Sequence, residues 1–138
     1  LDFESGKKCL EECYRVLKPT GIIRIATPDL KGLFSVYNNN NNMVNSREAL
    51  QRHRSNHNKD CLNLCHFIND NFRLWGHSFI YDFETLESVF KNIGFKKINH
   101  VKFGISNFPE LNGLEIHADT EWMKSAYQII IEVQKSHD

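Results

Sequence analysis

The chain has 138 residues and a mass of 16.2 kDa, a size that allows a single domain. Its 17 lysines and arginines balance 17 aspartates and glutamates, so the formal net charge is zero with histidine neutral. This balance argues against a dedicated binder of nucleic acid or of an anionic membrane, because both need a cationic surface. No apolar run reaches the length of a membrane span, and residues 1–15 are too charged for a secretory signal. We therefore expect a cytoplasmic protein with reduced cysteines.

A helix is predicted from about Phe3, with Asp2 as its N-cap. Its apolar side chains recur at helical spacing and are Leu10, Cys13, Tyr14 and Leu17. Pro19 ends this helix, because the residue before a proline disfavours helical geometry. Residues 21–27 are nearly continuous apolar sequence interrupted by Arg24, which is typical of a strand covered on both faces.

Residues 38–45 begin with an unbroken asparagine run, and asparagine favours turns over helix or strand. We expect a surface loop there, followed by one polar helical stretch over about 46–71. A second clear helix is predicted to begin after Asp82, which can act as its N-cap. It ends before Gly94, because glycine suits the position after a helix end.

Two more strands are predicted in the last third of the chain. Val101, Phe103 and Ile105 alternate with other residues, which indicates a strand with one wet face. Residues 127–133 contain three consecutive isoleucines, as expected of an interior strand. Residues 106–124 between them are expected to be an irregular loop. A helix between the first two strands favours a parallel pair in an α/β sheet, and the last strand is expected to run antiparallel.

With these elements placed, the chain resembles the C-terminal half of a class I S-adenosylmethionine-dependent methyltransferase of the "type 11" group. The resemblance rests on the order and spacing of several segments, namely CYRVLKPTG at 13–21, NFRLWGH at 71–77, YDFETL at 81–86 and LNGLE at 111–115. It implies strands five to seven of a Rossmann-like methyltransferase sheet with flanking helices. In that sheet the antiparallel last strand lies between the other two.

The resemblance also implies a cofactor, S-adenosylmethionine. The seven glycines of this sequence include no G-x-G turn of the kind that lets a backbone approach such a cofactor at a helix N-terminus. We therefore expect residues 1–138 to be one partial domain that is inactive alone, with its cofactor-binding half upstream of Leu1. The methyl acceptor is left open as a small molecule or a glycan-related group.

Asp29 and His77 are the candidate catalytic residues. Asp29 follows the first strand, and ligands of open α/β sheets lie beyond the carboxyl ends of the strands. A turn or helix-cap role is the favoured alternative for Asp29. His77 changes charge near neutral pH and could act as a base or orient a substrate. The alternative for its neighbourhood is a packed aromatic corner.

The candidate acceptor-binding residues are Trp75, Tyr81, Glu115 and His117. Trp75 and Tyr81 belong to the same aromatic cluster as His77 and could wall an acceptor pocket. Glu115 and His117 lie in the long loop before the last strand and could contact the acceptor as part of a lid. A solvated loop is the favoured alternative there.

Four residues with metal-binding side chains, His53, His57, Cys61 and Cys65, recur at steps of four on the polar helical stretch. Cysteine and neutral histidine are good zinc ligands. On one straight helix these residues would rise by roughly 18 Å, too far to meet at one ion. We therefore expect no metal site, with one pair plus His66 or a residue elsewhere as the remaining possibility.

A non-catalytic protein is the alternative to an enzyme, either a degenerate methyltransferase fragment or an interaction module. The first strand would then lack its usual neighbour in the sheet. Its exposed edge would allow the chain to associate with itself.

Overall fold

The computed structural model describes residues 1–38, 43–116 and 118–136. Its α-helices are α1 (Phe3–Val16), α2 (Leu30–Asn38), α3 (Met43–Asn56), α4 (Leu64–Arg73) and α5 (Phe83–Ile93). Its strands are β1 (Ile22–Pro28), β2 (Lys96–His100) and β3 (Gln128–Gln134). Two short helical turns, η1 (Pro109–Leu111) and η2 (Met123–Tyr127), lie between β2 and β3. The protein is therefore of the mixed α/β class, as predicted.

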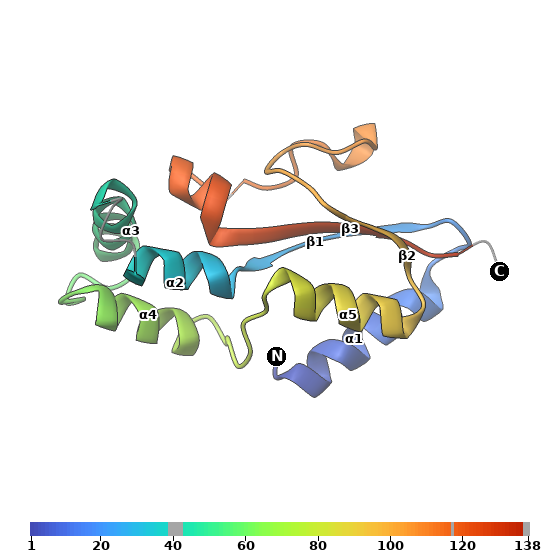
Figure 1. Cartoon of the computed structure of the whole chain (residues 1–138), viewed down its shortest axis with the longest axis horizontal. Coiled ribbons are helices and arrows are strands. Elements are labelled where there is room, and N and C mark those ends of the chain that lie inside the picture. The colour runs from blue at the N-terminus through green and yellow to red at the C-terminus, as the bar shows by residue number, and fades with distance from the viewer. Residues whose placement is uncertain (39–42, 117, 137–138) are drawn as a thin grey trace.

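The three strands form one sheet in the order β1-β3-β2, in which β3 is antiparallel to both neighbours (Figure 1). β1 and β2 therefore run in the same direction. β1 pairs with β3 along its whole length, from Ile22 opposite Gln134 to Pro28 opposite Gln128. The interior place and the direction of the last strand confirm the prediction from the sequence.

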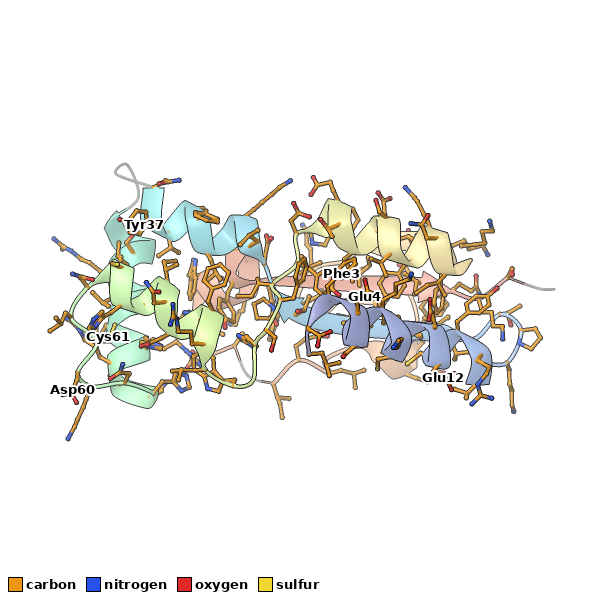
Figure 2. The ribbon with its side chains drawn as sticks, turned by 90° about the horizontal axis from the view of Figure 1, so that it is seen from below. Phe3, Glu4, Glu12, Tyr37, Asp60 and Cys61 are labelled. Carbon is orange, nitrogen blue, oxygen red and sulfur yellow. The ribbon has the colours of Figure 1, made fainter. Side chains whose placement is uncertain are left out.

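One face of the sheet packs on α1 and α5, which lie side by side beneath it (Figures 1 and 2). Alternate residues of β3 point into this first core. The main buried contributors are Ile129, Ile131 and Val133 from β3 with Leu10, Leu86, Val89 and Phe90 from the helices. Because β3 lies in the middle of the sheet, its apolar side chains lose most of their contact with water, and this burial stabilises the fold.

The caps of α1 and α5 agree with the sequence. The Asp2 carboxylate accepts the Ser5 backbone N–H at 2.8 Å, and the Asp82 carboxylate accepts that of Thr85 at 2.9 Å. Both predicted N-caps are therefore confirmed. Gly94 follows α5 with φ of 112°, a left-handed conformation that favours glycine.

The opposite face of the sheet holds a buried arginine. Arg24 on β1 lies across from Glu132 on β3, and only 3% of its side chain is exposed. Its guanidinium donates to Glu132 at 2.5 Å and to both carboxylate oxygens of Glu115 at 2.6 and 2.9 Å. It also donates to the backbone carbonyls of Lys102 and Ile105. Arg24 therefore ties the connection between β2 and β3 to this face.

A second core lies beyond the end of β1, where α2, α3, α4 and η2 gather (Figure 1). Leu30 begins α2 only two residues after the strand ends. The buried residues of this core are Leu33, Val36, Ala49, Cys61, Phe67, Ile80, Trp122 and Met123. The carboxyl end of β1 is thus enclosed by helices.

The predicted strand at 101–105 is wrong, because β2 covers Lys96–His100. Val101 still donates its N–H to the carbonyl of Ile130 on β3. After Val101 the backbone turns, with Gly104 at φ of 68°, and its carbonyls face the Arg24 guanidinium. The alternation of apolar side chains could not reveal that Arg24 binds the backbone carbonyls that a strand would use for pairing.

The single polar helix predicted over 46–71 is also wrong, because this stretch forms α3 and α4. Asn63 begins the second helix, since its side chain accepts the N–H of His66. The loop predicted for 38–45 is wrong at its ends, where Asn38 closes α2 and Met43 opens α3. Residues 39–42 lie outside the described residues.

Gly32 lets α2 approach η2 closely. A Cβ on Gly32 would lie 1.7 Å from the carbonyl oxygen of Ala126, so Gly32→Ala must push the helix or the turn aside. We expect the free energy of unfolding, measured by urea denaturation, to fall by about 3 kcal/mol. Gly113→Ala is the control, because a Cβ there meets nothing within 4 Å and its φ of 69° alone costs about 1 kcal/mol. Equal losses in both variants would contradict this packing.

Candidate functional site

A pocket of about 340 Å³ lies among α3, α4 and η2 in the second core. The aromatic and polar side chains that line it include Arg52, His53, His57, Trp75, Trp122 and Tyr127. Its volume suits a ligand of one or two rings. The pocket lies beyond the carboxyl end of β1, which is where open α/β sheets bind ligands.

Trp75 is the predicted acceptor-binding residue that the structure places in this pocket. Its indole meets the rings of His57 and His53 edge-on, with centroids 4.9 and 6.0 Å apart. Its backbone has φ of 57°, which bulky residues rarely adopt because of steric strain. The residue is nevertheless 49% exposed. A strained backbone that holds an exposed aromatic ring over a pocket is a pattern found at ligand sites.

Trp122 brings an unpaired hydrogen-bond donor to the pocket lining. Its side chain is almost fully buried, and its Nε1–H has no partner in the described structure. A buried donor without a partner costs roughly 1–3 kcal/mol, so such groups call for an explanation. The nitrogen exposes less than 1 Å² of surface, so a ligand oxygen in the pocket reaches it only after the neighbouring side chains shift.

The other side of the pocket is held by a hydrogen-bonded asparagine. The buried Asn71 accepts the Tyr127 hydroxyl at 3.1 Å and donates to the carbonyl of Phe67 at 2.8 Å. Burial raises the pKa of Tyr127, so its hydroxyl stays protonated and donates. Because Asn71 is on α4 and Tyr127 is in η2, this bond fixes the two sides of the pocket relative to each other.

His57 is the pocket residue best suited to accept a proton. Burial lowers its pKa, and the nearby charges of Arg52 and His53 lower it further, so the imidazole is neutral at pH 7. Arg52 pairs with Asp119 and approaches His57 Nε2 at 3.5 Å. An arginine donates only, so this nitrogen is the unprotonated one. Sequence reasoning weighed His57 as a metal ligand only and missed this role.

His77 lies beside the pocket, with its ring 5.6 Å from that of Trp75. Its Nδ1 is 2.7 Å from the backbone carbonyl of Asn71, which can only accept, so Nδ1 carries a proton. His77 therefore fixes the turn after α4, and it does not line the pocket.

Asp29 and Tyr81 lie apart from Trp75. The Asp29 carboxylate accepts the Lys31 N–H at 3.0 Å, the helix-cap role that sequence analysis favoured. Burial raises the pKa of Asp29 despite these backbone contacts. Tyr81 packs on Phe3 and Phe79 beside α1, and these contacts place it against the first core. The predicted joint wall of Trp75 and Tyr81 is therefore not formed.

Glu115 is not in the solvated loop that sequence analysis favoured. Both of its carboxylate oxygens are engaged by Arg24, and one also accepts the Gly104 N–H at 2.9 Å. The hydrogen bond from Arg24 holds the pKa of Glu115 below its usual range. Its side chain thus holds the loop on the sheet and leaves little capacity for an acceptor. His117 lies outside the described residues.

One cluster of potential metal ligands corresponds to the possibility that the sequence analysis left open, a pair of the four residues plus a residue elsewhere. His53, Cys61 and Asp70 place one ligand atom each within 4.8 Å of one another. The distance argument against a metal site assumed one straight helix, but the chain reverses between α3 and α4. The signal for that reversal was the turn-forming run Asn58-Lys59-Asp60, inside an otherwise helical pattern.

A larger hollow of about 620 Å³ lies over the end of β2. It is lined by residues of 100–105 with Lys124, Ser125, Gln128 and Ile130. Its side chains are mainly apolar or cationic, and no buried unpaired donor lines it in the described structure. The smaller pocket therefore has the more specific chemistry.

Comparison with known proteins does not assign the chain to a family. No family model matches it, and no curated protein or solved structure matches it either. In the described residues, no helix has both the length and the apolar character that crossing a bilayer requires. Function must therefore be argued from the residues and their geometry.

The Arg24–Glu115 pair predicts a pH-dependent stability. Because the pKa of Glu115 is lower in the folded state, the pairing stabilises the fold fully at pH values above the unfolded pKa, near 4.5. This stabilisation is lost as the pH falls through the lower, folded pKa. We expect Glu115→Gln to lower the free energy of unfolding by about 2 kcal/mol at pH 7. The difference in free energy of unfolding between wild type and Glu115→Gln should shrink as the pH falls below 4.5.

The control for this prediction is Glu12→Gln on α1. Glu12 also pairs with an arginine, Arg15, but both side chains are exposed, so we expect no measurable loss. Denaturation curves at several pH values test both variants. A gap for Glu115→Gln that does not change with pH would contradict the assignment.

Proposed function

We propose that residues 1–138 form the acceptor side of an S-adenosylmethionine-dependent methyltransferase that works in the cytoplasm. The sequence resemblance supports this, together with the order and directions of the three strands, which are those that the resemblance implied. The observation that carries the proposal is the aromatic pocket beyond the carboxyl end of β1, with its unpaired Trp122 donor.

The described residues do not fit the cofactor itself. The turn from β1 into α2 has no glycine, and the Asp29 carboxylate already occupies the N-terminus of that helix. A cofactor carboxylate or hydroxyl would compete with Asp29 there. We therefore place S-adenosylmethionine on residues outside 1–138 and derive no step through it.

What these residues can supply is the binding and deprotonation of the methyl acceptor. Trp75 offers an aromatic face to a flat ring or to the apolar face of a sugar, and Trp122 offers a donor for an oxygen. The neutral His57 can take the proton of an acceptor hydroxyl or amine once its unprotonated Nε2 is released from Arg52. The acceptor is therefore a small aromatic or glycan-related molecule of one or two rings, which the pocket volume suits.

An interaction module is the second candidate, favoured by the outer edge of β1. β1 pairs with β3 on one side, and its apolar residues Ile22, Ile23 and Ile25 are only partly buried. Such an edge can pair with a strand of another chain. Sedimentation of the 138-residue chain over a range of concentrations distinguishes a self-associating protein from a monomer.

The cofactor assignment is tested by titrating the 138-residue chain with S-adenosylmethionine in a calorimeter. We expect no binding in the micromolar range, because the described residues offer no site for it. Micromolar affinity would contradict the placement of the cofactor on other residues.

Activity is tested on the protein expressed from its complete open reading frame, by following S-adenosylhomocysteine with a panel of hydroxylated aromatics and sugars. We expect turnover with at least one acceptor, and a loss of kcat/KM of about 10- to 100-fold in Trp75→Ala. Phe34→Ala is the matched control, because Phe34 is equally exposed, at 48%, but lies on α2 outside the pocket. Absence of turnover, or equal losses in both variants, would refute the proposed site.

The role of the Trp122 donor is tested by Trp122→Phe, which keeps an aromatic ring and removes the N–H. We expect KM for the best acceptor of that panel to rise by about tenfold, the loss of one hydrogen bond. Stability in urea should change little, because the variant also removes an unpaired buried donor. An unchanged KM would mean that Nε1 contacts no ligand.

A further inference from the structure

The two helices that carry one wall of the pocket also hold three metal-binding side chains in contact. His53 is on α3, Cys61 is in the connection and Asp70 is on α4. His53 Nε2 lies 2.7 Å from the Asp70 carboxylate, and the three ligand atoms all lie within 4.8 Å of one another. His53 and Cys61 are buried, and Asp70 is partly buried. Figure 2 places Cys61 at the end of the molecule where α3 and α4 meet.

The connection between the helices is held in the shape that brings these groups together. The Asn58 side chain donates to the same Asp70 oxygen at 2.8 Å, and its backbone N–H bonds to the carbonyl of His53. The Arg54 guanidinium donates to the carbonyls of Cys61 and Leu62. The ligand atoms are therefore positioned by hydrogen bonds before any metal binds, which reduces the cost of forming a site.

We propose that His53, Cys61 and Asp70 form a three-ligand site for a divalent transition metal, with zinc as the preferred ion. The donor set is one imidazole nitrogen, one thiolate sulfur and one carboxylate oxygen, which suits zinc and excludes hard ions such as magnesium. Three protein ligands leave the fourth tetrahedral position to water.

The geometry needs only small shifts. Zinc bonds of about 2.0–2.3 Å place neighbouring ligand atoms roughly 3.3–3.7 Å apart. From 2.7 Å, the His53–Asp70 pair must open by about 1 Å or less, and a pair at the 4.8 Å limit must close by roughly 1.1–1.5 Å. Cys61 releases its thiol proton to solvent on binding, against the raised pKa that burial gives this thiol, and His53 presents an unprotonated ring nitrogen to the ion.

A hydrogen-bonded His–Asp pair without metal is the competing interpretation. It explains His53, Asn58 and Asp70, and it leaves Cys61 as a small buried residue of the second core that lies at the same point. The Cys61 thiol donates a hydrogen bond of 3.6 Å to the carbonyl of Asn63, which it must give up to bind an ion as a thiolate. A bound ion would also join α3 to α4, which meet through a small core.

The experiment is a titration of the 138-residue chain with cobalt(II), the spectroscopic substitute for zinc, followed by displacement with zinc. We expect one equivalent to bind and to produce a thiolate-to-cobalt charge-transfer band that zinc abolishes. Zinc should also raise Tm by roughly 5 °C or more when it exceeds Kd by about 100-fold. The test needs no methyl donor or acceptor, so its outcome is independent of the proposed activity.

Matched cysteine variants locate the site. Cys61→Ser should abolish the band and weaken zinc by about 100-fold. Cys65→Ser, at an exposed cysteine four residues later on α4, should behave as wild type. Asp70→Asn should weaken zinc and keep the band. A wild-type chain that binds cobalt without a thiolate band holds the metal at surface histidines, and this result would overturn the proposal. So would equal effects of the two cysteine variants, or no binding at all.

Discussion

The structure depends on the place of β3 between two strands that both run against it. Because β3 runs antiparallel to both neighbours, it begins at the end of the sheet where β1 and β2 end. The chain therefore returns over the face that carries Arg24 and arrives beside α2 and α4 before it enters the sheet. This route delivers Trp122 and Tyr127, the last side chains before β3, to the carboxyl end of β1. Strand order and pocket are thus consequences of one constraint.

The pocket concentrates features that weaken a fold. A left-handed bulky residue, Trp75, and a buried donor without a partner, Trp122, both line it. In the first core the helices are capped by carboxylates and the buried residues are apolar, but the Tyr81 hydroxyl that packs there is also buried without a partner. Local rules of stability are broken most often where a protein binds something. The feature that favours a binding role for the second core is therefore the left-handed backbone of the bulky, exposed Trp75 beside the pocket.

The sequence predicted those elements whose signals are local. Asp2 and Asp82 mark helix starts through carboxylates that accept a backbone N–H three residues on, and Gly94 marks a helix end by its left-handed backbone. The run of isoleucines needs an interior strand whatever surrounds it. The prediction from sequence failed where a contact with a residue far away in the chain determines the local structure. Residues 101–105 alternate like a strand, but Arg24, far away in sequence, binds their carbonyls. Trp75 was predicted as a pocket residue, whereas His57 and Trp122 enter the site only because α3, α4 and η2 meet.

The chain has two tryptophans, and both line the pocket. One indole is half exposed beside two histidine rings, and the other is buried. Their emission therefore differs in wavelength, and the exposed one is sensitive to the charge of those histidines. In the 138-residue chain, tryptophan fluorescence therefore reports on the candidate site. Ligand screening needs neither a label nor a known activity.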